Sequence, residues 1–253
     1  MERQLEISGD VVLITGAAGN LGCALSRVFA RAGCKVAGLD ISAPRLERFS
    51  AAVAEVGGES LALACDLRDW EASRRAVDEA AHVFGGVDIL VNNATARTNP
   101  VLKPLHECTA EEMTLVAEVG PHAALGMMRA ALPYLKKRPG TVINLGSGAG
   151  LEPTGGMAPY AMSKGAMHTL TRAAAREWGQ HGITVNAVLP IVMTEQLART
   201  IQDNPEKIPM PPIGRYGDPE RDLGPVVQFL ASRAASYVTG QCLPVDGGMD
   251  MMR

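Results

Sequence analysis

The stretch Thr15-Gly16-Ala17-Ala18-Gly19-Asn20-Leu21-Gly22 joins an apolar run, residues 11–14, to a segment of helical character that extends to about Ala32. Small residues at such a junction let the backbone approach a ligand closely, and the free N–H groups at the start of the helix attract anions. Asn20 suits the turn because asparagine adopts left-handed backbone conformations more readily than most residues. The stretch predicts a strand, a turn that holds a pyrophosphate, and a helix. A glycine-rich turn that binds nothing is the alternative.

Short apolar runs alternate with helical segments along the rest of the chain. Apolar residues recur at helical spacing from Leu46 to Val56 and from Trp70 to Phe84, and we expect each stripe to be buried. Further strand candidates are residues 35–39, 61–64, 87–91, 141–145, 183–188 and 242–245. Because strands that alternate with helices form right-handed βαβ units, the sequence predicts an α/β fold with a doubly wound, Rossmann-like parallel sheet. We expect a single domain over residues 1–253.

Composition narrows the class of protein. The 253 residues are 47% hydrophobic and 20% charged, which excludes a disordered or fibrous chain. The net charge is −3 without a block of like charge, so we expect a small-molecule partner rather than nucleic acid or a membrane surface. The five cysteines are scattered and the five histidines lack ligand spacing, so we expect no disulfide framework and no metal site. No apolar run reaches the roughly 18 to 20 residues of a membrane helix, and we expect a cytoplasmic protein.

One late segment has an unusual composition. Four prolines lie between Asn204 and Gly217, whereas no other segment resembles a proline-rich linker. We therefore expect a mobile substrate loop near residues 192–217.

Asp40 ends the second strand candidate, about twenty residues beyond the glycines. A carboxylate at this place can hydrogen-bond both hydroxyls of an adenosine ribose, and its charge repels a 2′-phosphate. Gly19, Ile41 and Ser42 supply no cation to hold such a phosphate, so the sequence predicts NAD rather than NADP. The alternative role for Asp40 is that of a helix N-cap before Pro44.

Three polar residues form a candidate catalytic set. Tyr160 and Lys164 lie four residues apart on a segment of helical character, and Ser147 follows the strand candidate 141–145. Side chains four apart share one helix face, and open α/β sheets bind ligands at strand ends. A nearby ammonium lowers the pKa of a phenol from its usual value of about 10, so we expect Lys164 to make Tyr160 an effective acid and base. Ser147 would hold a substrate oxygen, although each residue alone also fits a structural role.

The chain resembles the short-chain dehydrogenases/reductases of about 250 residues, from about Ser8 to Gly248. The resemblance rests on residues 15–22, 40, 65–67, 91–94, 147, 160, 164, 185–187, 236–241 and 245–248. It implies an oxidoreductase that transfers hydride between NAD and a secondary alcohol or ketone, assembled as a homotetramer or homodimer. The cofactor-binding residues that it implies are Gly16, Asn20, Leu21, Gly22, Asp40, Asp66, Leu67, Asn93, Ala94, Tyr160, Lys164, Pro190 and Thr194. By the resemblance, Asp66 meets the adenine and Thr194 lies near the nicotinamide amide.

The chain departs from the family pattern at Asn20, Thr95, Ile191 and Gly120. Glycine is usual at the first three positions, and Ile191 places Thr194 one residue early. Gly120 stands where the family has a fourth catalytic residue, an asparagine that is thought to bend its helix and to position a water near the catalytic lysine. Pro121 cannot donate to the carbonyl four residues back, so we expect the Gly120-Pro121 pair to bend the helix instead. Loss of this relay with slower turnover is the alternative.

The substrate is not identified by the sequence. Arg97 and His122 could reach it, and the flanking residues Leu151, Met157, Met193 and Leu197 imply a largely apolar pocket. Two functions remain as alternatives to an NAD-dependent dehydrogenase. One is an NADP-linked 3-oxoacyl reductase, and the other is a catalytically idle NAD-binding regulatory protein, which the departures at Gly120 and Ile191 favour.

Overall fold

The computed structural model describes residues 5–96, 102–206 and 208–250. Within these residues the chain forms one seven-stranded parallel sheet in the order β3-β2-β1-β4-β5-β6-β7. The strands are β1 (Val11–Thr15), β2 (Lys35–Asp40), β3 (Glu59–Ala64), β4 (Ile89–Asn92), β5 (Thr141–Leu145), β6 (Thr184–Pro190) and β7 (Cys242–Val245). The predicted doubly wound, Rossmann-like α/β fold is therefore confirmed.

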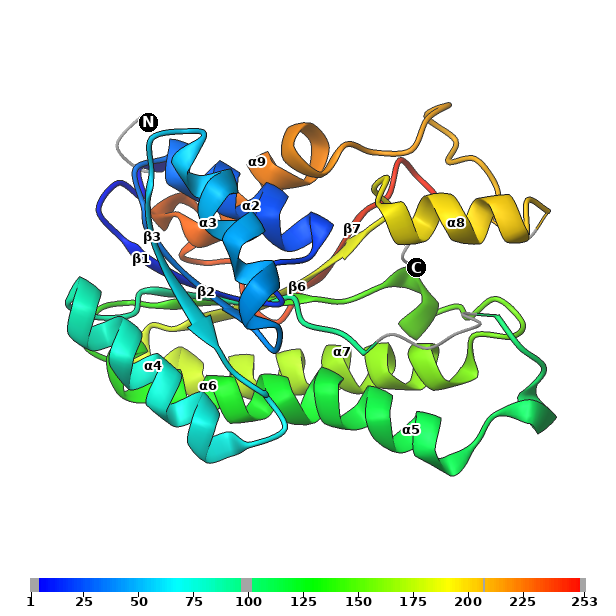
Figure 1. Cartoon of the computed structure of the whole chain (residues 1–253), viewed down its shortest axis with the longest axis horizontal. Coiled ribbons are helices and arrows are strands. Elements are labelled where there is room, and N and C mark those ends of the chain that lie inside the picture. Colours follow the sequence, from blue (N-terminus) through cyan, green and yellow to red (C-terminus); the bar gives the residue numbers. More distant parts are fainter. Residues whose placement is uncertain (1–4, 97–101, 207, 251–253) are drawn as a thin grey trace.

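Helices cover both faces of the sheet. They are α2 (Asn20–Arg31), α3 (Leu46–Ala54), α4 (Trp70–Phe84), α5 (Ala110–Ala117), α6 (Ala123–Leu135), α7 (Ala158–Trp178), α8 (Glu195–Asp203) and α9 (Gly224–Ala231). Short 3-10 turns span Ala43–Arg45, Leu105–Glu107, Gly148–Gly150, Gly179–His181 and Arg233–Ala235, and π-helical segments span Glu118–His122 and Pro219–Leu223. In Figure 1, α2, α3 and α9 lie on one side of the sheet, and α4, α6 and α7 lie on the other.

The first strand shows why the sheet needs two layers of helices. Val11 and Leu13 pack into one hydrophobic core with α4, α6 and α7, whereas Val12 and Ile14 pack into a second core with α2, α3 and α9. Successive side chains of a strand point to opposite faces, so a continuously apolar strand must be buried on both. The continuous apolar run at residues 11–14 therefore dictates a central strand of a covered parallel sheet.

The order of the strands places the site. From β1 the chain builds outward through β2 and β3 in one direction, and from β4 through β7 in the other. Ligands of open α/β sheets bind outside the carboxyl ends of the strands, at the point where the order reverses. The residues that follow β1, β4 and β5 therefore meet at one edge of the sheet.

Trp70 is an exception to the buried apolar stripe expected from Trp70 to Phe84. The rest of that stripe is buried in α4, but Trp70 remains 38% exposed. It is the first residue of α4, directly after the cap Asp69. That ring lies against Gly126 of α6, and the Arg129 guanidinium lies 5.0 Å from the ring centroid.

The segment at residues 192–217 contains the helix α8 and is closed at its base by a bridge between Val192 and Gly217. No residue of α8 is buried. The mobility expected for this segment stays a prediction.

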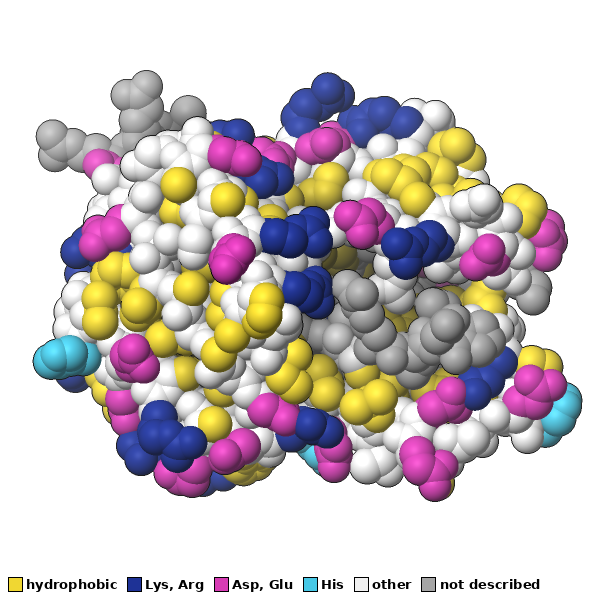
Figure 2. Space-filling model, viewed as in Figure 1, with side chains coloured by type: hydrophobic (Ala, Val, Ile, Leu, Met, Phe, Trp, Pro, Cys, Tyr) yellow, Lys and Arg dark blue, Asp and Glu magenta, His cyan; other side chains and the backbone are white. Residues whose placement is uncertain are grey.

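Acidic and basic side chains are interspersed on the face of the molecule that Figure 2 shows, which agrees with the small net charge. In the part of the chain that the structure describes, no helix combines the length and the apolar character needed to cross a membrane.

Candidate active site

Two glycines shape the turn between β1 and α2. Gly16 adopts a φ of +62°, in the left-handed region that favours glycine. A Cβ at Gly22 would overlap the carbonyl of Gly16 and the backbone of Ala17, so the first turn of α2 packs directly on the loop. The turn therefore has no room for a side chain at Gly22 and uses a backbone conformation at Gly16 that favours glycine.

The start of α2 fits a pyrophosphate. Gly19 caps the helix with an extended backbone and offers no side chain to its N–H groups, and the first turn carries no acidic residue. The N–H groups at Asn20 and Leu21 are therefore free to bind an anion, which the helix dipole also attracts. Asn20 is an ordinary first residue of the helix, and no non-glycine residue in the described ranges has a positive φ. Asn20 therefore does not use the left-handed conformation that asparagine adopts more readily than most residues.

Asp40 lies where the sequence predicts it, at the end of β2. Its side chain is 8% exposed, and its Oδ1 atom accepts a 3.1 Å hydrogen bond from the N–H of Ser42. Ser42, rather than Asp40, precedes the helical turn at Pro44. The carboxylate therefore lies at the end of β2 and does not serve as a helix cap.

Arg45 is a feature that sequence reasoning missed. Its Nη2 atom donates a 3.3 Å hydrogen bond to the carbonyl of Ala18, in the loop between β1 and α2. A guanidinium thus lies beside the predicted pyrophosphate turn. The residues next to Asp40 in the sequence do not reveal this cation, because a 3-10 turn brings it back to the loop from five residues away.

Asp66 and Leu67 follow β3 at the same edge of the sheet. Leu67 is buried, whereas Asp66 pairs with Arg68 through a 2.6 Å contact between Oδ2 and Nη2. Arg68 holds the pKa of the Asp66 carboxyl below its usual range. Asp66 is thus an ionised acceptor at the place where the resemblance puts an adenine.

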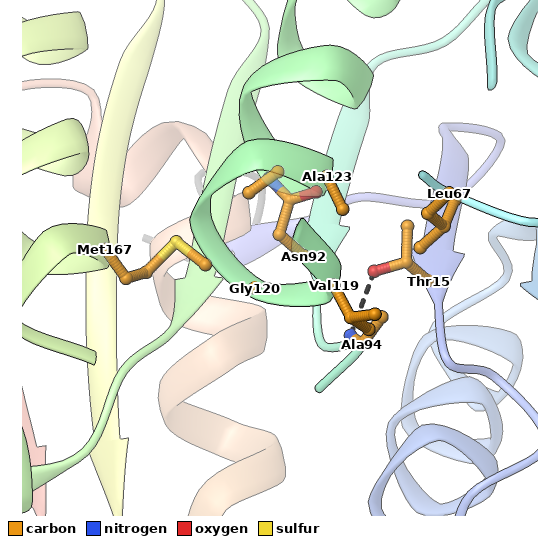
Figure 3. A pocket seen from close by; sticks show the side chains of 9 residues that line it. Thr15, Leu67, Asn92, Ala94, Val119, Gly120, Ala123 and Met167 are labelled. Carbon is orange, nitrogen blue, oxygen red and sulfur yellow. Dashed lines mark hydrogen bonds between the residues drawn. The ribbon is translucent and has the colours of Figure 1, made fainter. Parts of the chain in front are cut away.

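The loop after β4 grips the loop after β1. The backbone N–H groups of Asn93 and Ala94 each donate a 3.0 Å hydrogen bond to the Thr15 Oγ1 atom. The Asn93 amide donates to the carbonyls of Thr15 and Gly16, at 2.9 and 3.1 Å. Figure 3 shows the side chains of Thr15 and Asn92 around the same narrow space as Ala94. Thr15, absent from the predicted site residues, therefore anchors both loops.

Ser147, Tyr160 and Lys164 are brought together. Ser147 follows β5, while Tyr160 and Lys164 lie one turn apart on α7. The Lys164 ammonium is 5.5 Å from the centroid of the Tyr160 ring and donates a 2.7 Å hydrogen bond to the carbonyl of Leu145. Lys164 is 6% exposed. Its charge is therefore held inside the protein, beside the phenol and at the end of β5.

The electrostatics of this set differ from the expectation. Burial raises the pKa of the Tyr160 phenol, and the neighbouring Ser147 hydroxyl only partly offsets this increase. Burial also lowers the pKa of Lys164 to about 8. The lowered pKa expected for Tyr160 is therefore wrong, because burial raises the pKa more than the Ser147 hydroxyl lowers it. At neutral pH the site holds a protonated phenol beside a lysine that is still charged.

Comparisons with known proteins agree with this geometry. A family model described as enoyl-(acyl carrier protein) reductase matches residues 16–250. A 12alpha-hydroxysteroid dehydrogenase of a Clostridium species is 36% identical over 255 residues, which cover 95% of this chain and 96% of the relative. A 3-oxoacyl-(acyl-carrier-protein) reductase of Vibrio cholerae is 33% identical over 251 residues, 98% of this chain and 100% of the relative. The structure of an NAD+-bound xylitol dehydrogenase superposes with a TM-score of 0.88 at 30% identity, over 96% of this chain and 100% of that one.

The chain belongs to the short-chain dehydrogenase/reductase family. Members of this family are oxidoreductases that act on alcohol and ketone substrates with a nicotinamide cofactor, and this class of activity applies to the chain.

The family's fourth catalytic position is occupied by a break in a helix. A π-helical segment, Glu118–His122, separates α5 from α6, and Gly120 has the non-helical angles φ −90° and ψ −106°. The bend expected from the Gly120-Pro121 pair is therefore confirmed. Ser163 of α7 donates a 2.9 Å hydrogen bond to the carbonyl of Val116 just before the break. Whether the break also replaces the family's asparagine in proton transfer stays a prediction.

Pro190 and Thr194 lie at the end of β6. Pro190 is the last residue of the strand, and the N–H of Ile191 continues the pairing with β7 by donating to the Val245 carbonyl at 3.0 Å. The Thr194 hydroxyl caps α8 by accepting a 3.1 Å hydrogen bond from the N–H of Leu197. This hydroxyl is therefore engaged by the helix, and its role toward a nicotinamide stays a prediction.

The residues proposed to contact a substrate are only partly described. His122 is exposed within the π-helical segment, and Leu151 and Met193 are 40% and 41% exposed. Arg97 lies outside the described residues. The expected apolar character of the pocket stays a prediction.

Proposed function

We propose that this short-chain dehydrogenase/reductase is an NAD-dependent enzyme that interconverts a secondary alcohol and a ketone by direct hydride transfer. The observation that carries the proposal is the buried Lys164 ammonium, 5.5 Å from the Tyr160 ring and one loop away from Ser147. A buried charge is costly unless it is used or paired, and here no carboxylate contributes to its pKa. The ammonium is thus well suited to act on the neighbouring phenol.

The bound dinucleotide supplies the hydride chemistry, and the residues of the chain manage the proton and the geometry. Tyr160, which is protonated in the free protein, donates its proton to the ketone oxygen during reduction and takes the hydroxyl proton during oxidation. Lys164 stabilises the phenolate in the second case. The Ser147 hydroxyl holds the substrate oxygen beside the phenol. Gly16, Asn20, Leu21 and Gly22 form the pyrophosphate turn, and Asp40 faces the adenosine ribose.

The preference for NAD rests on Asp40, and Arg45 is the feature that opposes it. A carboxylate at the end of β2 can bind the ribose hydroxyls and repels a 2′-phosphate, whereas a guanidinium at the loop can attract one. An NADP-linked 3-oxoacyl reductase is therefore the second candidate, because of Arg45 and because one relative bears that name. The family neighbour xylitol dehydrogenase binds NAD+, which supports the first candidate.

The chain also has features suited to assembly as a homotetramer or homodimer. Strand β7 ends the described sheet, and its Leu243 is 37% exposed. Tyr237 and Phe229, which precede it in the chain, are also exposed. Unpaired edge strands and exposed apolar side chains favour association. The cytoplasmic location stays a prediction.

A screen of secondary alcohols with NAD, followed by the absorbance of the reduced nicotinamide, tests the function. We expect at least one alcohol to be oxidised and Tyr160→Phe to lower kcat by about 10²- to 10⁴-fold. Tyr134→Phe is the matched control, because the Tyr134 hydroxyl bonds to Asp78 on α4, away from the trio. Unchanged turnover in Tyr160→Phe would refute the role of the phenol. Binding of NAD without oxidation of any alcohol would instead favour the idle regulatory protein.

A further inference from the structure

His168 is a buried, ionisable side chain that the proposed mechanism does not use. It lies on α7, one turn after Lys164, and is only 1% exposed. Its Nε2 atom accepts a 3.4 Å hydrogen bond from the backbone N–H of Ser147. Its Nδ1 atom is buried and has no hydrogen-bond partner among the described residues. The ring therefore contacts the backbone of Ser147, the proposed catalytic serine.

The loop around Ser147 is built to accommodate this ring. A Cβ at Gly146 would approach the His168 Nε2 atom to 2.7 Å, and a Cβ at Gly150 would approach its Cε1 atom to 2.7 Å. Real Cβ atoms do not make contacts this short without a shift of the neighbour. Glycines on both sides of Ser147 therefore let the loop lie flat against the imidazole.

The ring is neutral in this environment. Burial, together with the nearby cations Arg172 and Lys164, lowers the pKa of His168 to about 4. A neutral imidazole has one donor and one acceptor nitrogen. Because Nε2 accepts the Ser147 N–H, the proton is on Nδ1, where it has no described partner.

An unsatisfied buried N–H group is a cost that an apolar side chain would avoid. A leucine at position 168 would fill similar space without a polar atom, whereas the imidazole leaves one nitrogen unpaired in return for one contact. That contact is made with the residue whose hydroxyl must stay beside the phenol. The cost of leaving Nδ1 unpaired is therefore explained if the site requires Nε2 as the acceptor for the N–H of Ser147.

We propose that His168 is a positioning residue, which holds the backbone of Ser147 through its Nε2 atom and thereby keeps the Ser147 hydroxyl beside Tyr160. The Ser147 Oγ atom also accepts a 3.3 Å hydrogen bond from the N–H of Ala149. Two hydrogen bonds thus fix this residue, one at its backbone and one at its side chain. The inference rests on the proposed function, because it assigns a purpose to the position of Ser147.

Three substitutions separate the acceptor at Nε2 from the bulk of the ring. His168→Gln places its amide oxygen where Nε2 lies, His168→Asn places its oxygen at the position of Nδ1, and His168→Leu has no acceptor. We expect kcat to fall by about 10- to 100-fold in the Asn and Leu variants, because small errors in position are costly in catalysis. We expect kcat of the Gln variant to stay within about threefold of the native value, since it restores the acceptor.

The same variants distinguish positioning from a general loss of structure. We expect the KM for the alcohol and the Kd for NADH, measured by its fluorescence, to stay unchanged in all three. His181→Gln is the control, because His181 is exposed beyond the end of α7. If the Leu variant does not fold, the comparison of Gln with Asn decides. Equal kcat values for Gln and Asn, or a native kcat in Leu, overturn the proposal.

A spectroscopic test does not depend on turnover. In the full-length protein at pH 7, nitrogen NMR of the imidazoles, assigned by comparison with His168→Gln, should show His168 with its proton on Nδ1. A proton on Nε2 overturns the proposal, because that nitrogen could not then accept from Ser147. If the proposed function itself is wrong, the result is different. Tyr160→Phe then keeps full activity, whichever nitrogen of His168 carries the proton.

Discussion

Gly120 faces the Ser163 hydroxyl so closely that any Cβ at position 120 would overlap the Ser163 Oγ atom. The same hydroxyl donates a 2.9 Å hydrogen bond to the carbonyl of Val116. Val116 lies five residues before Pro121, which has no N–H group to offer to the turn. Ser163 therefore supplies a donor to a carbonyl just before the break, and the broken helix is joined to α7 directly beside Lys164.

Restoring the family's asparagine should therefore harm this protein. In Gly120→Asn the new Cβ must displace Ser163 and weaken its bond to Val116. We expect the free energy of unfolding to fall by about 1 to 3 kcal/mol, as for overpacked interiors. We also expect a lower kcat, because Lys164 adjoins the displaced residue. Urea denaturation and steady-state kinetics measure the two effects.

The double variant Gly120→Asn/Ser163→Ala isolates the clash. Removing the hydroxyl should recover part of the lost stability, so that the two substitutions are not additive. Gly179→Ala is the control, because a Cβ there meets no atom within 4 Å. A single variant Gly120→Asn that is as stable as the native protein and more active would mean that the break is a defect rather than an adaptation.

The fold was predictable because local patterns alone determine it. The apolar run at residues 11–14 requires burial on both faces, and the glycines at 16 and 22 require a tight turn into a helix. Strand 141–145 matches its predicted bounds. The position of Asp40 at a strand end likewise follows from the sequence, because it depends only on where β2 stops.

Features that depend on contacts across the fold were not predictable. Arg45 reaches Ala18 only because a 3-10 turn folds it back on the loop, and His168 reaches Ser147 only because α7 packs under β5. The pKa of Tyr160 was misjudged because the sequence shows the neighbouring cation but not the loss of water around the phenol. The exposure of Trp70 also depends on where α4 begins relative to its neighbours.

Lys164 should make the stability of the protein depend on pH. Its pKa is about 8 in the folded state and 10.5 in the reference state, so the unfolded chain binds more protons between these values. The contribution of Lys164 to the free energy of unfolding is therefore lowest below pH 8 and rises as the pH increases from 8 to 10.5. Relative to Lys164→Met, the native protein should gain on the order of 3 kcal/mol between pH 8 and 10.5.

Urea denaturation of both proteins at pH 7, 8, 9.5 and about 10.5 gives this difference directly. Tyr160, whose pKa is raised by burial, is present in both proteins. Lys136→Met, at an exposed position, is the control and should show no such trend. A constant gap between the native protein and Lys164→Met over this range would show that the ammonium titrates as it does in water.

The contact of Gly22 with the loop should be needed for cofactor binding. In Gly22→Ala the added methyl group overlaps the Gly16 carbonyl and pushes α2 away from the turn. We expect a Kd for NADH at least tenfold higher and a loss of about 1 to 3 kcal/mol in stability. Fluorescence titration and denaturation report the two changes, with Gly179→Ala again as the control. Native affinity in Gly22→Ala would mean that the loop yields without cost.

Asp40 and Arg45 should act on cofactor preference in opposite directions. Asp40→Asn removes the charge that we propose to bind the ribose hydroxyls and to repel a 2′-phosphate. The value of kcat/KM with NAD should therefore fall by about 10- to 100-fold, the value of a hydrogen bond to a charged group. The value with NADP should fall less or rise. Arg45→Ala should lower kcat/KM with NADP and leave that with NAD within about threefold. Rates with both cofactors, measured on the same alcohol, give the preference.

Glu47→Gln provides the matched control for charge. Glu47 is exposed in the first turn of α3, so its substitution removes one negative charge from the segment that follows β2 without touching that strand. If Glu47→Gln shifts the cofactor preference as far as Asp40→Asn does, the overall electrostatic potential determines this preference rather than a contact with the ribose. The opposite outcome is a native protein that prefers NADP and loses that preference in Arg45→Ala. That result would mean that Arg45 rather than Asp40 determines the cofactor. The cation would then outweigh a carboxylate that already accepts a hydrogen bond from Ser42.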